Sequence, residues 1–180
     1  MRRTKTSPPE GVAVVATDIV AGVVYEKNGV RVTAFEVDHG ALLKPAFGYR
    51  IDYGGHSVVI SGDTRPTENL VRFAKGTDVL IHEVAMASPE LMKSSDSVRR
   101  IIGHHTIPQE AGKIFSRVKP KLAVYSHIVL FTKDGLPTLG QLVEATRTTY
   151  DGPLQVGADL MTFDIGSTIT VHDAGAARGN

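Results

Sequence analysis

The order of apolar runs along the chain is the feature that most limits how it can fold. Two pairs of β-branched and aromatic runs are joined by the dipeptides Asn28-Gly29 and Gly54-Gly55, which predicts two β-hairpins. After Asp63 the apolar runs instead alternate with segments of helical periodicity. Strands in succession, followed by strands separated by helices, indicate an α/β fold in which helices pack on a mixed sheet.

Three helices are predicted by their end signals. Thr67 can cap the first and Gly76 can end it, while Pro108 suits the first turn of the second and Pro120 lies beyond its end. The predicted helical segments are RPTENLVRFAKG, TIPQEAGKIFSRVKP and TLGQLVEATRTTY. Between and after them, strands are predicted over TDVLIHEV, KLAVYSH, DLMTFDI and STITVHD.

Composition narrows the chemistry that the chain can use. The 180 residues contain no cysteine, so disulfides, thiolate metal sites and a cysteine nucleophile are excluded and a metal site needs His, Asp or Glu. Twenty basic and 19 acidic residues leave a formal net charge of +1, which does not demand a nucleic acid or an anionic membrane as partner.

The length is typical of one domain, predicted over residues 12–173, with flexible segments at 1–11 and 174–180. No stretch approaches the roughly 20 apolar residues that a membrane-spanning helix requires. The basic start of the chain is not followed by the apolar core of a signal peptide. We therefore expect a cytoplasmic protein that does not interact with membranes.

Residues that bind metals or protons stand where predicted strands end. His104 and His105 open the loop before the Pro108 helix, and the strand ends carry Asp38-His39, Asp63, His82-Glu83 and Ser126-His127. Open α/β sheets place their sites at the carboxyl ends of strands. Imidazoles with a carboxylate suit zinc or a similar divalent ion, and two such ions can activate water for a phosphoryl-type displacement.

The string of motifs resembles the metallo-β-lactamase superfamily, specifically its ribonuclease Z-like branch. The matching pieces span about residues 30–128 and are, in order, VDHGALLKPAFGYRI, VVISGDT, DVLIHEV, HHTIPQEAGKIF and LAVYSHI. The resemblance implies a four-layer αβ/βα sandwich with a dinuclear metal site on its upper edge. It also implies a hydrolase in which metal-activated water attacks a phosphodiester, sulfate ester or other ester.

The resemblance assigns roles to five residues. His39 matches a terminal ligand of the first metal, Asp63 the carboxylate that bridges both metals, and His127 a ligand of the second. His105 matches a histidine near the leaving group that could donate a proton or contact a phosphate, and Glu83 an acidic residue that can orient that histidine. The catalytic set is thus His105, Glu83 and Asp63, and the implied metal is zinc, with manganese or iron as alternatives.

One departure from the family concerns the metal ligands. The family motif His-x-His-x-Asp-His is absent from this sequence, and none of the seven histidines has its spacing. The chain therefore resembles the C-terminal αβ half of the domain. We expect such a half to expose an apolar sheet face and to form a homo-oligomer or to pair with a separate N-terminal half. Metal occupancy is left open by the missing ligands.

A second departure concerns the substrate. The long arm with which ribonuclease Z grips transfer RNA is absent between the GYR and SGDT strands, which are joined here through DYGGH. The segment after His127 also lacks the Arg-Tyr pair of transfer-RNA processing members. We therefore expect a small-molecule ester or phosphodiester as substrate and do not expect transfer RNA as a partner.

Three functions remain open on the sequence. The first is a metal-dependent hydrolase. The second is a catalytically incomplete half-domain that self-associates or pairs with another chain. The third is a non-enzymatic binding module that uses the same sheet edge as a ligand groove. Metal content separates the first from the other two.

Overall fold

The computed structural model describes residues 16–173 of the chain. The segments 1–11 and 174–180, predicted to be flexible, lie outside the described residues. None of the described helices is long and apolar enough to cross a membrane. The elements are, in chain order, β1 (Gly22–Lys27), β2 (Val30–Glu36), β3 (Phe47–Tyr53), β4 (His56–Ile60), α1 (Glu68–Ala74), β5 (Val79–Ala87), α2 (Pro89–Ser94), α3 (Asp96–Ile102), α4 (Pro108–Val118), β6 (Leu122–Phe131), α5 (Leu139–Arg147), β7 (Leu154–Val156), β8 (Thr162–Ile165) and β9 (Ile169–His172).

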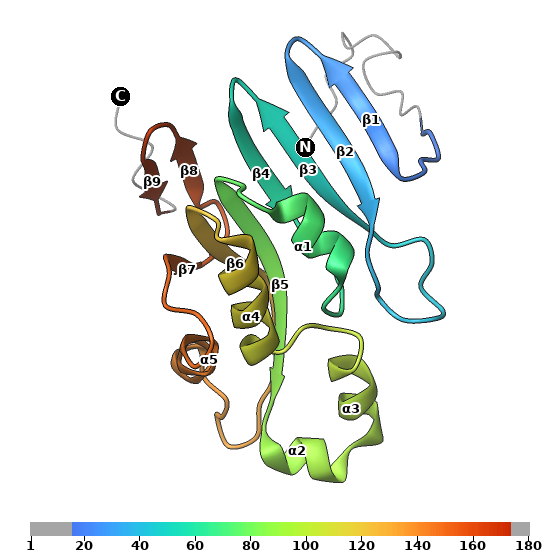
Figure 1. Ribbon diagram of the computed structural model, residues 1–180. Helices are drawn as coiled ribbons and strands as arrows, with labels where there is room; N and C mark the ends of the chain where they lie inside the picture. The colour runs from blue at the N-terminus through green and yellow to red at the C-terminus, as the bar shows by residue number, and fades with distance from the viewer. Residues whose placement is uncertain (1–15, 174–180) are drawn as a thin grey trace, which may run out of the picture.

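The main sheet has seven strands that lie side by side in sequence order (Figure 1). β1 to β4 pair antiparallel, and β4 to β7 pair parallel. Both predicted hairpins are confirmed. Asn28 and Gly29 have φ of 53° and 80°, and Gly54 and Gly55 have φ of 57° and 83°, as turns with two left-handed residues require.

The helices α1, α4 and α5 pack on one face of this sheet. Parallel neighbours are joined by right-handed crossovers, and because β4 to β7 progress in one direction across the sheet, their crossover helices must fall on the same side. Figure 1 shows α1 and α4 lying over that face, with α2 and α3 at one end of the molecule. The predicted mixed sheet with helices packed on it is confirmed.

The main core lies between this sheet face and the helices. Its sheet side includes Phe35, Leu80 and Tyr125, and its helix side includes Leu70 and Phe115, all of them buried. α1 begins as predicted at Thr67, whose side chain accepts a hydrogen bond from Leu70 N. Burying each of these apolar side chains contributes roughly 1.5–3 kcal/mol. The apolar spacing of the helices therefore decides which side of each helix faces the sheet.

The opposite face of the sheet is covered only in part by the described residues. The β8–β9 hairpin packs there, with Phe163 and Val171 against Val79 and Val124. Val79 belongs to a row of paired apolar residues on this face. In strand order the row is Val32, Ile51, Val58, Val79 and Leu122. Towards β1 the face opens to solvent, since Tyr25 is 49% exposed and Ile60 40%. Among residues 16–173, part of this sheet face is therefore exposed.

Three elements were missed in the sequence. α2 and α3 have only six and seven residues, and few of these are buried. The apolar residues of these segments therefore show little helical periodicity in the sequence. Their starts are nevertheless marked, because Ser88 and Ser95 each accept a hydrogen bond from the backbone N–H three residues later. β7 has only three residues and is defined by its pairing with β6 alone.

His82 is a fully buried histidine on β5. Its Nδ1 lies 2.5 Å from the carbonyl oxygen of Glu83, and its ring meets Phe115 edge-on at a centroid distance of 5.7 Å. Among the described residues, its Nε2 has no hydrogen-bond partner. Burial lowers the pKa of His82 to about 4, because the imidazolium would be desolvated.

We expect His82→Leu to make the protein less sensitive to acid. The unfolded chain protonates this histidine below about pH 6.5, whereas the folded chain does so only near pH 4. The stability from neutral His82 is thus present above pH 6.5 and is lost as the pH falls, at up to about 1.4 kcal/mol per pH unit. Urea unfolding between pH 4 and 7 should show a shallower acid slope for His82→Leu than for wild type. Equal slopes for wild type and His82→Leu would contradict the assignment.

Candidate metal centre

The predicted site residues lie at one edge of the main sheet because the strands that carry them run in one direction. β2 and β4 are both antiparallel to β3, and β4, β5 and β6 are parallel. The carboxyl ends of these strands therefore meet at the same edge. His39 and Asp63 follow β2 and β4, Glu83 lies in β5, and His127 in β6.

Two imidazoles face one carboxylate oxygen. The Nε2 of His127 lies 3.4 Å from Oδ2 of Asp63, and the Nε2 of His39 lies 3.9 Å from the same oxygen. The His39 side chain is 19% exposed, whereas the side chains of Asp63 and His127 are 41% and 53% exposed. The three predicted metal ligands, separated by up to 88 positions along the chain, are thus neighbours in space.

A backbone carbonyl selects the tautomer of His39. Its Nδ1 lies 3.1 Å from the carbonyl oxygen of His104, and since a carbonyl can only accept, Nδ1 carries the hydrogen of that bond. The neutral ring then presents the lone pair of Nε2 towards Asp63. This is the usual arrangement of a metal-ligating histidine, whose second ring nitrogen donates to a fixed acceptor.

A β-bulge aims the side chain of His127. In the β5–β6 ladder, Glu83 pairs with Ser126 and Val84 with Ile128, so His127 is an extra residue in β6. Its φ is 45°, a left-handed value that is uncommon for residues other than glycine. Bulges of this kind turn a side chain away from the regular alternation of a strand. The strand period in the sequence gives no sign of this bulge.

An ion pair ties the loop of His39 to that of Asp63. Both oxygens of Asp38 accept from Nη2 of Arg65, at 2.7 and 2.6 Å. The backbones also pair, because Arg65 N donates to the Asp38 carbonyl at 2.7 Å. Nearby arginine holds the pKa of Asp38 below its usual value. Arg65 was missed as a site residue, although it directly follows the recognised Gly-Asp-Thr motif.

Glu83 and His105 form a second, buried pair beside these ligands. Oε2 of Glu83 lies 3.0 Å from Nδ1 of His105, and Oε1 accepts from Thr106 N at 2.7 Å. The hydroxyl of Thr106 donates to the Thr64 carbonyl at 2.7 Å. The structure therefore places Glu83 where it can orient His105 and binds the His105 loop to the Asp63 loop.

Burial shifts both members of this pair towards their neutral forms. It raises the pKa of Glu83 to about 8, and the Asp63 carboxylate adds to the rise while hydrogen bonds from Thr106 and Thr64 oppose it. The pKa of His105 is lowered, chiefly by burial and next by the positive charge that His39 can carry. At neutral pH the Glu83 carboxyl therefore holds a proton that it can donate to Nδ1 of His105.

The donor set suits a divalent ion but is incomplete. Two ligands of one tetrahedral zinc lie roughly 3.3 Å apart, given zinc–nitrogen distances of about 2.0 Å. The 3.4 Å separation of His127 and Asp63 matches this spacing, whereas the 3.9 Å separation of His39 and Asp63 exceeds it. Within residues 16–173 no group of three or more His, Asp or Glu side chains is gathered closely enough to hold an ion. His39, Asp63 and His127 thus fit a metal in kind, but at this spacing they are only part of a ligand set.

His56 and His172 lie beside other carboxylates, away from this centre. The Nδ1 of His56 is 3.6 Å from a carboxylate oxygen of Asp78, and the Nε2 of His172 is 2.8 Å from one of Asp164. His104 stays close by, with its ring 6.0 Å from that of His39, but it contributes its carbonyl rather than its ring to the hydrogen bonding.

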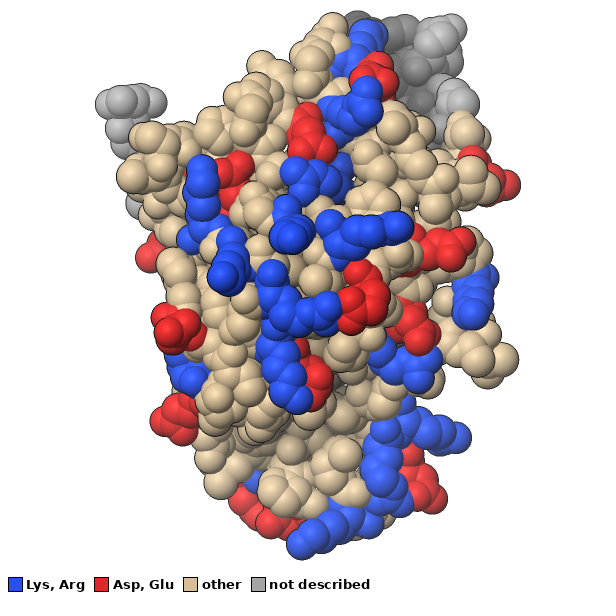
Figure 2. All heavy atoms as spheres, viewed as in Figure 1, with Lys and Arg blue, Asp and Glu red and all other residues tan. Residues whose placement is uncertain are grey.

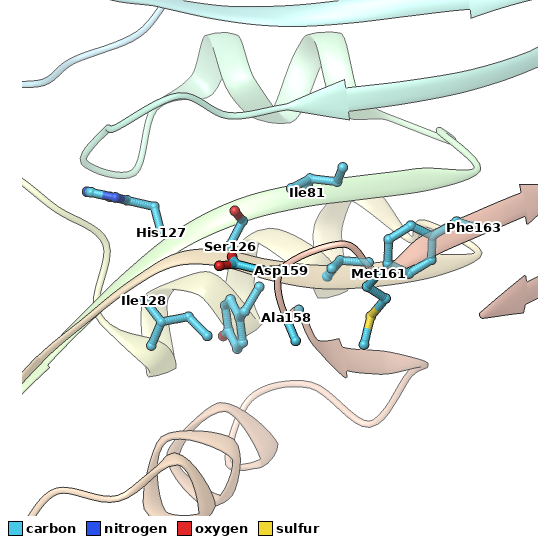
Figure 3. Close-up of a pocket in the computed structure, with 11 residues that line it drawn as sticks. Ile81, Ser126, His127, Ile128, Ala158, Asp159, Met161 and Phe163 are labelled. Carbon is cyan, nitrogen blue, oxygen red and sulfur yellow. The ribbon is translucent and has the colours of Figure 1, made fainter. Parts of the chain in front are cut away.

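A cavity of about 450 Å³ opens next to His127, between the sheet and the loop from β7 to β8. Figure 3 shows His127 at one end of this cavity and the side chains of Met161 and Phe163 at the opposite, apolar end. The Ser126 hydroxyl and the Asp159 carboxylate lie between these two ends. The imidazole of His127 points away from that apolar end. The cavity is of a size that suits a ligand group beside the metal ligands.

Comparison with known proteins relates the chain to one family. A family model described as a β-lactamase superfamily domain matches residues 2–128. The chain is 29% identical over 160 residues to a ribonuclease Z of Mycobacterium tuberculosis, with 89% of this chain and 56% of that protein covered. It is 26% identical over 170 residues to a ribonuclease Z of Mycolicibacterium gilvum, with 94% and 57% covered. The chain thus spans little more than half the length of these relatives.

Solved structures agree on the fold. The metallo-β-lactamase fold protein YhfI of Bacillus subtilis superposes with a TM-score of 0.57 at 18% identity, over 74% of this chain and 48% of that one. Human tRNase Z, short form, superposes with a TM-score of 0.50 at 20% identity, over 77% and 44%. The predicted α/β fold of the metallo-β-lactamase type is confirmed.

These comparisons overturn the expected partner. A small-molecule substrate was expected and transfer RNA was not, but the curated relatives that match most of this chain are named ribonuclease Z. The expectation rested on a missing arm, on a missing Arg-Tyr pair after His127 and on a net charge of +1. These arguments were weak, because an arm or a residue pair is only one contact of a large substrate and a sum of charges does not show where the charges lie.

The matched family model covers residues 2–128, relatives named ribonuclease Z match most of the chain, and the folds superpose. The chain therefore belongs to the metallo-β-lactamase superfamily of hydrolases, in its ribonuclease Z-like branch.

Proposed function

We propose that the chain takes part in the metal-dependent hydrolysis of RNA phosphodiester bonds, with transfer-RNA precursors as substrates. The observation that carries this proposal is the convergence of His39 and His127 on Asp63, at 3.9 and 3.4 Å, at the carboxyl edge of the sheet. The names of the relatives support RNA as the substrate.

The metal would be held by His39, Asp63 and His127. A bound divalent ion such as zinc supplies a water of lowered pKa and stabilises charge on the phosphoryl oxygens. The protein holds these ligand side chains in fixed orientations. The carbonyl of His104 orients His39, the bulge orients His127, and the Asp38–Arg65 ion pair holds the two loops together.

His105 is suited to donate a proton to the leaving oxygen. When Glu83 is neutral, its carboxyl donates to Nδ1 of His105, and the imidazole must then carry its hydrogen on Nε2. When the pair is ionised as carboxylate and imidazolium, Nε2 carries a hydrogen as well. Both charge states therefore give the free nitrogen of His105 the proton that a leaving group needs.

The incomplete ligand set favours a second candidate. The sequence lacks the His-x-His-x-Asp-His motif, and the sheet exposes Tyr25 and Ile60 on the face opposite the helices. In this alternative the chain supplies part of the site, and ligands from another polypeptide segment complete it across the apolar face. Metal stoichiometry separates the complete hydrolase from the incomplete half-domain. About two ions per chain would support a complete site, and one or none would support the incomplete half-domain.

The ligand assignment predicts the effect of Asp63→Ala. Because Asp63 is the carboxylate that both imidazoles face, its loss should weaken zinc binding at least about tenfold and abolish cleavage of a transfer-RNA precursor with a 3′ extension. The matched control is His56→Ala, which removes a histidine outside the site. Zinc per chain is measured by elemental mass spectrometry after size-exclusion chromatography. Equal zinc content in both variants would show that the assignment is wrong.

Proton donation predicts the effect of His105→Ala. Loss of a positioned general acid should slow cleavage of the same precursor about 10²- to 10⁴-fold without changing the zinc content. A substrate whose leaving group needs no proton, such as a p-nitrophenyl phosphodiester, should lose far less rate. If both substrates slowed equally, His105 would act through the structure of the site and not as a proton donor.

The raised pKa of Glu83 predicts a stability change in the metal-free protein. The folded state keeps its proton to about pH 8, whereas the unfolded chain loses it near pH 4.5. The stability from protonated Glu83 is thus fully present below pH 4.5 and is lost as the pH rises to about 8, at up to about 1.4 kcal/mol per unit.

Glu83→Gln imitates the protonated carboxyl, because its amide can donate to His105 while its oxygen accepts from Thr106. Its thermal midpoint should exceed that of wild type by an amount that grows from pH 5 to pH 8. Glu83→Ala, which leaves the buried Thr106 N–H without an acceptor, should be less stable than wild type at every pH. A constant difference between wild type and Glu83→Gln across this range would contradict the shift.

A further inference from the structure

Lys and Arg side chains gather on the face of the molecule that α1 and α4 cover (Figure 2). Part of this band is a group that we call the basic cluster, at the junction where both helices end. It consists of Arg50, Arg72, Lys75, Arg117 and Lys119.

The fold itself brings these five residues together. Lys75 and Lys119 are the C-cap residues of α1 and α4, and the two caps are neighbours because Gly76 N donates to the Val118 carbonyl at 3.0 Å. Arg50 reaches across from β3, and its Nη1 donates to the Phe73 carbonyl at the end of α1 at 2.8 Å.

The cluster has more positive than negative charge. Arg50 and Arg117 are paired with Asp52 and Glu68, at 2.9 and 2.6 Å. Among the described residues, Arg72, Lys75 and Lys119 form no ion pair, and all three are exposed. Three uncompensated charges thus share one surface of a chain whose formal net charge is only +1.

The helix dipole offers a local explanation for the cations at the ends of α1 and α4. A positive side chain near a helix C-terminus is stabilised by the helix dipole by about 0.3–1 kcal/mol. That effect accounts for a cation on each helix separately. It does not account for the placement of both ends side by side with a third arginine from β3, where like charges repel unless an anion lies between them.

The distance to the candidate metal centre limits what could bind. α4 starts at Pro108, two residues after Thr106, and its 11 residues rise by about 16 Å before Lys119. A ligand that touches both places must extend over that length with negative charge along it. At one phosphate per strand for roughly each 3.4 Å of duplex axis, about five base pairs span the gap.

We propose that the basic cluster binds the phosphate backbone of the RNA substrate and positions it, while the bond to be cleaved lies at the metal centre. This inference rests on the proposed function. Contacts of this kind fix register and orientation without reading bases, so binding through the cluster is independent of sequence and sensitive to salt.

The test removes the three uncompensated charges together in the variant Arg72→Gln, Lys75→Gln, Lys119→Gln. The probe is a fluorescent RNA stem with a short single-stranded 3′ tail, and its affinity is measured by anisotropy from 50 to 300 mM KCl. Each lost phosphate contact should lower the slope of log affinity against log salt by about one. We expect the slope to fall by two to three, and the affinity at 100 mM salt to fall at least about tenfold.

The matched control is Lys27→Gln, Lys93→Gln, Lys133→Gln. It removes three exposed lysines that form no ion pair with another described residue and that lie on β1, α2 and the loop after β6. This control variant loses the same net charge as the cluster variant, but from three separate parts of the surface. A slope that falls only in the cluster variant supports the proposal. Equal slopes in both variants, or a wild-type protein that does not bind the RNA, would overturn it.

Two further readouts separate the remaining possibilities. Competition by polyglutamate at equal charge concentration, as strong as that by the RNA stem, would assign the surface to an acidic protein and overturn the proposal. Cleavage of the transfer-RNA precursor by wild type reports on the proposed function independently. A protein that cleaves RNA but keeps its salt slope in the cluster variant refutes the basic cluster alone, and one that shows no cleavage with any loaded metal refutes the function.

Discussion

The strand directions of one sheet determine where everything else in the structure lies. Because β2, β4, β5 and β6 run in the same direction, their carboxyl ends deliver His39, Asp63, Glu83 and His127 to one edge. Right-handed crossovers then place the connecting helices on a single face, which leaves the opposite face to the β8–β9 hairpin. The site, the basic surface and the open apolar face are therefore three consequences of one topology.

Hydrogen bonds between loops convert this shared edge into a definite geometry. The loop of His39 is tied to that of Asp63 through Asp38 and Arg65, and the loop of His105 is tied to it through Thr106. Glu83 lies beneath these loops, and its burial keeps it largely neutral at neutral pH. A neutral buried carboxyl avoids the cost of a desolvated charge and still fixes His105. In the proposed function, Glu83 therefore both positions His105 and supplies the hydrogen of the bond between them.

The net charge was a poor guide to the partner, because the position of the charged residues on the surface matters more than their sum. A net charge of +1 gave no reason to expect a nucleic acid partner, yet Lys and Arg side chains gather on the face that α1 and α4 cover (Figure 2). Net charge is a sum over the whole surface, whereas a polyanion responds to the field over the part that it touches. The names of the relatives point away from the small-molecule substrate that the missing arm, the missing Arg-Tyr pair and the low net charge had favoured.

The sequence by itself determined the hairpins at Asn28-Gly29 and Gly54-Gly55, the α1 and α4 boundaries, and the family through its ordered motifs. These features depend on neighbouring residues, through turn chemistry, capping and apolar period, so a linear reading finds them. Only the tertiary structure decided the bulge at His127, the tautomer of His39, the Asp38–Arg65 pair and the neutral state of Glu83. Each depends on burial or on contacts between residues distant in the chain, which no local pattern encodes.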